Sequence, residues 1–153
     1  MNIKEELIAL VKAFDSAGIP YALCGGMAMA AHGWPRSTMD IELLVPQGRI
    51  DAAKQVANGL GFSHEPGTMA LEQGRIHIVR LVKFAGEDFL PLDLIQADQG
   101  AQQAWNSREK IMTDHGPICL VSKDGLIAMK KLRGSGTDHD DIEKLSGGMD
   151  AKR

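Results

Sequence analysis

Two acidic side chains, Asp40 and Glu42, stand two positions apart in the segment Met39-Asp40-Ile41-Glu42-Leu43-Leu44-Val45. Acidic and apolar residues alternate there, which is typical of a β-strand, and residues two apart on a strand point to the same face. Two like charges at close range repel each other, and a cation between them removes the repulsion. Oxygen donors of this kind suit Mg²⁺ or Mn²⁺. The alternative is that both side chains face water on a sheet with one solvated side.

A third carboxylate, Asp93, lies inside the apolar run Leu90-Pro91-Leu92-Asp93-Leu94-Ile95. An uncompensated charge within such a strand would be costly. If this strand lies beside the strand of Asp40, a third oxygen donor joins the same site. If it is instead a solvated edge strand, Asp93 only faces water.

A pair of glycines, Gly25-Gly26, separates the short apolar run 20–24 from the Ala- and Met-rich segment 27–31, which suits a helix. Backbone N–H groups between a strand and a helix can receive a phosphate. Glycine serves there because the backbone must approach the ligand closely and can need a positive φ. A simple turn is the alternative interpretation of the pair.

The elements that would position these residues follow from hydrophobic periodicity and turn signals. Helices are predicted at 3–16, 27–31, 50–60, 98–108, 123–132 and 138–145; strands at 20–24, 39–45, 75–84 and 89–95, the last two joined by a turn at 85–88; and a weak hairpin at 109–121. This order predicts an α+β fold, an α/β sandwich in which helices flank a small mixed sheet. We expect one domain over 1–146 and a flexible C-terminal tail at 147–153.

Composition excludes several classes of protein. The 153 residues include 17 basic and 20 acidic side chains, and the net charge of −3 argues against a strongly electrostatic nucleic-acid or membrane binder. No apolar run approaches the length of a membrane-spanning helix, and no secretory signal is visible, so a cytoplasmic location is expected. Cys24 and Cys119 lie far apart and are predicted to be buried free thiols. The histidines show no metal-binding spacing.

The glycine pair and the carboxylates together carry a resemblance. Gly25-Gly26 followed by Pro35-Arg36-Ser37-Thr38-Met39-Asp40-Ile41-Glu42 resembles the signature of the polymerase-β-like nucleotidyltransferase superfamily. More narrowly, the segment 21–24 and the Arg36-Ser37-Thr38 lead-in look like small bacterial nucleotidyltransferase proteins grouped with the AbiEii toxins of type IV toxin–antitoxin systems. The segment 126–135, followed by Asp138 and Asp141, is similar to the second half of that pattern.

The resemblance implies a minimal nucleotidyltransferase fold, two Mg²⁺ or Mn²⁺ ions, and transfer of NMP from an NTP to an acceptor hydroxyl with release of pyrophosphate. It implies roles for residues of this chain as follows: Asp40, Glu42 and Asp93 as catalytic residues that hold the metals, and Gly25, Gly26, Arg36, Ser37, Thr38, Lys130, Asp138 and Asp141 as nucleotide-binding residues. The acceptor stays open between tRNA, a protein and a small molecule. A homodimer or an antitoxin partner is also open, and acceptor recognition is expected from segments 62–75 and 98–120.

Several of these residues also have interpretations that require no role in nucleotide binding. Arg36 could be solvated in its polar loop, Asp138 and Asp141 could stabilise a helix N-terminus, and one of the adjacent lysines 130 and 131 could be only surface charge. The chain also departs from the pattern: Glu42 stands where close relatives usually carry Asp, and Ser135 and Thr137 stand where many carry basic residues. These departures motivate a second hypothesis, a catalytically weak or inactive nucleotidyltransferase-like binding protein, such as one half of a toxin–antitoxin pair.

Overall fold

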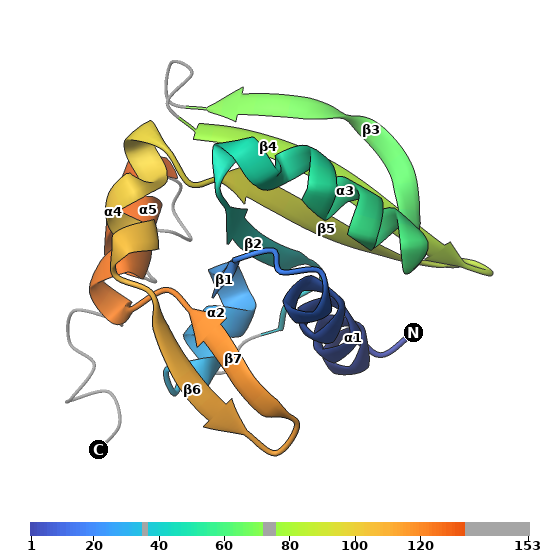
Figure 1. The fold of residues 1–153 in the computed structure, drawn as a ribbon, viewed down its shortest axis with the longest axis horizontal. Coiled ribbons are helices and arrows are strands. Elements are labelled where there is room, and N and C mark those ends of the chain that lie inside the picture. The colour runs from blue at the N-terminus through green and yellow to red at the C-terminus, as the bar shows by residue number, and fades with distance from the viewer. Residues whose placement is uncertain (35–36, 72–75, 134–153) are drawn as a thin grey trace.

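A mixed seven-stranded sheet organises the protein (Figure 1). The computed structural model describes residues 1–34, 37–71 and 76–133. The strands are β1 (Ala22–Cys24), β2 (Ile41–Val45), β3 (Phe62–Leu71), β4 (Ile76–Ala85), β5 (Asp88–Gln96), β6 (Glu109–Thr113) and β7 (Gly116–Leu120), and their order in the sheet is β3-β4-β5-β2-β1-β7-β6. The helices are α1 (Ile3–Ser16), α2 (Gly25–Ala31), α3 (Ile50–Gly59), α4 (Gln102–Asn106) and α5 (Lys123–Arg133), with 3₁₀ turns η1 (Gln47–Arg49) and η2 (Gln99–Ala101). The predicted α+β class is confirmed.

The centre of the sheet is formed by β2, which runs parallel to β5 and antiparallel to β1. All five residues of β2 are buried, so this strand is covered on both faces. A parallel pair such as β2 and β5 needs a crossover connection; here the chain between them forms α3, β3 and β4. The condition under which Asp93 joins the same site, that its strand lies beside the strand of Asp40, is therefore met.

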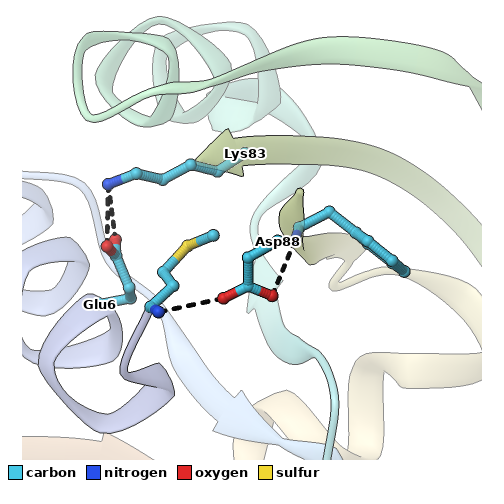
Figure 2. A network of polar contacts seen from close by, with 5 residues as sticks. Glu6, Lys83 and Asp88 are labelled. Atoms are coloured by element: carbon cyan, nitrogen blue, oxygen red, sulfur yellow. Dashed lines mark hydrogen bonds and ion pairs between the residues drawn. The ribbon is translucent and has the colours of Figure 1, made fainter. Parts of the chain in front are cut away.

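Helices α1 and α3 pack on one face of the sheet. The apolar side of α1 buries Leu7, Leu10, Val11 and Phe14, and that of α3 buries Ile50, Ala53 and Ala57. An ion pair fastens α1 to β4: Lys83 Nζ lies 2.8 Å and 2.9 Å from the two carboxylate oxygens of Glu6 (Figure 2). A second link joins the Met1 amino group to Asp88 at the start of β5, at 3.0 Å. Both contacts tie the N-terminal segment to the β4–β5 hairpin.

Three elements differ from the sequence-based expectations. Strand β3 was not predicted, because Pro66 and Gly67 interrupt any alternation and because the pairing with β4 shifts register at His64. Helix α2 begins at Gly25 itself, so the glycine pair belongs to the first turn rather than to a separate loop. The predicted helix 98–108 is shorter, with only Gln102–Asn106 α-helical after a 3₁₀ turn. The predicted helix 138–145 and tail 147–153 lie outside the described residues.

The hairpin predicted at 109–121 is confirmed as β6 and β7. Both cysteines are free thiols, as predicted. The predicted burial is confirmed for Cys24, whereas Cys119 is only half-buried. Within the described part of the chain, none of the helices combines the length and the apolar character that crossing a membrane requires.

Candidate active site

One continuous row of residues crosses five neighbouring strands. Cys24 pairs with Glu42, Glu42 with Asp93, Asp93 with Arg80, and Arg80 with Gly67. Directly paired residues of neighbouring strands point to the same face of a sheet. This face is opposite to the one that carries Leu23 and Leu43. The row therefore gathers two carboxylates and a guanidinium on one surface.

The carboxylates of this surface are held at different depths. Glu42 and Asp93 are buried, with residue exposures of 9% and 4%, whereas Asp40, directly before β2, is half-buried. The Thr38 hydroxyl donates to the Asp40 carbonyl oxygen at 3.1 Å and lies 3.5 Å from Asp40 Oδ1. These contacts link the Thr38 side chain to the residue that begins the acidic pair.

Arg80 engages Asp93 through both of its oxygens. Arg80 Nε donates to Oδ1 at 2.7 Å, and Arg80 Nη2 donates to Oδ2 at 2.9 Å. Such a bidentate pair is among the stronger polar contacts in proteins. The hydrogen bonds that Arg80 donates to Asp93 raise the pKa of Arg80, and the charges of Asp40 and Glu42 add to the rise. The guanidinium therefore lies within electrostatic reach of all three carboxylates.

Gly25 is held against the carboxyl group of Glu42. Its φ is +68°, and a Cβ built on it would overlap the Glu42 side-chain carboxyl group. Only glycine satisfies both conditions without strain. The close approach explains why a glycine stands at the junction of β1 and α2. It also brings the first turn of α2 next to the acidic surface.

A divalent cation fits this surface in chemistry, because Asp40, Glu42 and Asp93 offer oxygen donors only and hard cations prefer oxygen. The donors are not gathered as a finished cage. Among the residues that the structure describes, no group of three His, Cys, Asp or Glu side chains is placed to hold one ion. Both oxygens of Asp93 already accept hydrogen bonds from Arg80.

The other predicted residues that the structure describes lie on three further segments of the chain. Ser37 is exposed and Gly26 half-buried. Lys130 is buried in α5, the helix that packs on α4, whereas Lys131 is exposed, which agrees with the interpretation that one of the two is surface charge. Arg36, Asp138 and Asp141 lie outside the described residues, so their roles stay predictions.

Sequence reasoning missed Arg80. It is the one charged residue in the apolar run Ile78-Val79-Arg80-Leu81-Val82, as Asp93 is in its own strand. Counting back from the predicted turn at 85–88 pairs these two residues, so the signal was available. A cavity of 280 Å³ adjoins Arg80 and is otherwise lined by Pro66, Gly67 and Thr68.

The same face continues beyond the carboxylates to an exposed aromatic pair. Phe84 and Phe89 are paired across the β4–β5 hairpin, with ring centres 6.5 Å apart, and are 61% and 54% exposed. Each lies four residues along its strand from Arg80 or Asp93, which is about 13 Å in an extended chain. The His64 and Phe84 rings meet in a T-shaped arrangement, with their centres 5.6 Å apart. This pair is a second feature that the sequence analysis did not identify.

A larger cavity of 460 Å³ lies elsewhere, between α1, α2 and the β6–β7 hairpin. Its lining is mostly apolar and includes Leu23, Met27 and Ile111. Because Leu23 faces the opposite side of the sheet from Cys24, this cavity is separate from the acidic row. A choice between these two cavities by volume alone would therefore not select the one beside the acidic row.

Comparison with solved structures places the fold. The chain is similar to an antigenic nucleotidyltransferase-like protein from Paracoccidioides brasiliensis, with 21% identity, a TM-score of 0.58, and coverage of 93% of this chain and 74% of that one. It is also similar to ANT(2″)-Ia, solved in complex with adenylyl-2″-tobramycin, with 16% identity, a TM-score of 0.62, and coverage of 97% and 90%. No family model matches the sequence, and no curated protein does. The expected nucleotidyltransferase-like fold is thus confirmed as a fold.

Proposed function

We propose that this protein transfers a nucleoside monophosphate from an NTP to an acceptor hydroxyl and releases pyrophosphate. One observation carries the proposal: Glu42 and Asp93 are paired on adjacent parallel strands, with Asp40 beside them, on one face of a nucleotidyltransferase-like fold. Carboxylates held close together repel each other, and a divalent cation between them removes this repulsion. An NTP bound with Mg²⁺ or Mn²⁺ supplies cations together with the reacting phosphates.

The chemistry needs little from the protein beyond position and charge. The acceptor oxygen forms a bond to the α-phosphorus, the bond from that phosphorus to the bridging oxygen breaks, and the hydroxyl proton passes to a base. The divalent cations, when bound, would neutralise charge on the attacking and leaving oxygens. Asp40 and Glu42 would hold the cations, and the backbone at Gly25 and Gly26 would approach the triphosphate.

Labelled substrate tests this directly. The protein is incubated with Mg²⁺, each NTP labelled at the α-phosphate, and three acceptor preparations: bulk tRNA, cell-extract protein and tobramycin. We expect label in one acceptor pool, and a loss of at least about 10- to 100-fold in Asp40→Asn and Glu42→Gln. Asp51→Asn, an exposed acid on α3, is the matched control and should retain transfer. If wild type and Asp40→Asn alike transfer no label and bind no NTP, the proposal is wrong.

A second function is favoured by the state of Asp93. Because Arg80 takes both of its oxygens, the chain could bind a nucleotide without turnover, as a binding partner in a toxin–antitoxin pair. Glu42 in place of the usual Asp supports the same alternative. Calorimetry that shows tight Mg-NTP binding, with no pyrophosphate released over a long incubation with cell extract, would favour it over transfer.

A further inference from the structure

Asp93 and Arg80 differ sharply in their freedom to move. The Asp93 side chain is 6% exposed, whereas that of Arg80 is 37% exposed. The carboxylate is therefore fixed within the sheet, and the guanidinium reaches it from the solvent side. Arg80 is the partner that can leave.

Space for Arg80 to leave exists on the side away from Asp93. The residue paired with Arg80 on β3 is Gly67, and no atom lies within 4 Å of the position that a Cβ on Gly67 would take. The cavity of 280 Å³ that Arg80 lines with Pro66, Gly67 and Thr68 opens there. A long side chain can thus exchange its partner without moving the backbone of β4.

A divalent cation and Arg80 need the same oxygens. Both oxygens of Asp93 accept from the guanidinium, at 2.7 Å and 2.9 Å, so a cation can take either oxygen only if at least one hydrogen bond breaks. A buried carboxylate left alone would be strongly unfavourable. Exchange of one cation for the other avoids that cost, because Asp93 is never left without a positive partner.

We infer that Arg80 is a resident counter-ion of Asp93 that competes with the divalent cation for this carboxylate, so that cation binding and release of Arg80 are one coupled event. This inference rests on the proposed function, because it takes the cation to be the cofactor of transfer. Arg80 is a positioning residue in this scheme. Once released, its planar fork is suited to a phosphate oxygen of the nucleotide.

Calorimetric titration of the protein with Mn²⁺ alone, without nucleotide, tests the competition. Arg80→Met removes the competitor, and we expect Mn²⁺ to bind on the order of tenfold more tightly than to wild type. Lys83→Met is the matched control, because it removes one cation of an ion pair from the same strand but from the opposite face. Its Mn²⁺ affinity should equal that of wild type. If Arg80→Met does not fold, Arg80→Lys keeps the charge, loses the bidentate contact, and should show a smaller gain.

A second readout follows Arg80 directly. In wild-type protein labelled with ¹⁵N, the Nε–H resonance of Arg80 should shift progressively as Mg²⁺ is added, and that of Arg49 should not. Equal Mn²⁺ affinity in wild type, Arg80→Met and Arg80→Lys, with an unmoved Arg80 resonance, would overturn the inference.

Failure of the inference and failure of the proposed function leave different results. Label transfer by wild type with no gain in Mn²⁺ affinity in Arg80→Met overturns the inference alone. A gain in affinity with no transfer by either protein supports the inference and overturns the proposed function. Absence of Mn²⁺ binding to every variant overturns both.

Discussion

Replacement of Gly25 by alanine is expected to destabilise the protein and to disturb the acidic surface together. Gly25 has a φ of +68°, a conformation that alanine adopts only at a cost of about 1–2 kcal/mol. The new Cβ would also overlap the Glu42 carboxyl group, and overpacking of this kind costs about 1–3 kcal/mol. The free energy of unfolding of Gly25→Ala should therefore fall by roughly 2–5 kcal/mol.

The chain supplies a matched control at Gly18, just after α1. Gly18 has the same φ of +68°, but no atom lies within 4 Å of the position that its Cβ would take. Gly18→Ala thus carries the backbone strain without the overlap, and should cost only about 1–2 kcal/mol. The difference between the two variants isolates the contact between Gly25 and Glu42.

Urea denaturation followed by circular dichroism gives the two free energies, provided that the slopes of the transitions agree. Calorimetry with Mn-ATP gives the functional consequence, a loss of affinity in Gly25→Ala that Gly18→Ala does not share. Equal destabilisation by the two substitutions, within about 0.5 kcal/mol, would refute the reasoning about the overlap. Unchanged Mn-ATP binding in a folded Gly25→Ala would refute its link to the site.

Three further predictions concern other parts of the molecule. Burial raises the pKa of Tyr21, the sole tyrosine, from 10.0 to about 12, against the opposing effect of the hydrogen bond from the Cys119 N–H. An ultraviolet titration should therefore find the midpoint of Tyr21 near 12, and the free energy of unfolding should fall as the pH rises from 10 to 12. A midpoint at 10 in folded protein would contradict this. Burial also raises the pKa of the Cys119 thiol, so iodoacetamide at pH 8 should alkylate Cys119 more slowly in folded than in unfolded protein. Cys24 is buried and should react only on unfolding. Equal alkylation rates in folded and unfolded protein would contradict both expectations. In a double-mutant cycle, Lys83→Met and Glu6→Gln should each destabilise the protein, with a coupling energy of about 1 kcal/mol, since both side chains are partly buried; a coupling of zero would show that the pair is only a surface contact.

Much of the central sheet could be predicted from the sequence, because its strands are strongly patterned. Buried strands such as Ile41–Val45 and the apolar run around Asp93 have few alternative places in a small domain. The adjacency of these two strands was only a condition in the sequence argument, since neighbours in a sheet depend on contacts between segments far apart in the chain. The structure shows that the two strands are direct neighbours.

Other features could not be predicted for a physical reason. Strand β3 pairs at the edge of the sheet through backbone groups, and six of its first seven residues, from Phe62 to Thr68, are exposed, so no apolar period marks it. The contact between Gly25 and Glu42 depends on side-chain packing between segments 17 residues apart. Arg80 differs from both, because the predicted turn at 85–88 already sets it opposite Asp93, and attention to lone charges in both strands would have found the pair.

The row that runs from Cys24 through Glu42 and Asp93 to Arg80 has a consequence for how the protein acquires its site. A slip of one residue in any of the three strand pairings would turn part of the row to the opposite face. Correct register in all three strand pairings is therefore needed to bring the four side chains to one face. Hydrogen exchange should find the amides of β2 and β5 protected to the level of global unfolding, and competence to bind the cation should appear during refolding together with that protection. A chain with a slipped sheet would therefore lack the acidic surface on which the proposed cation site depends.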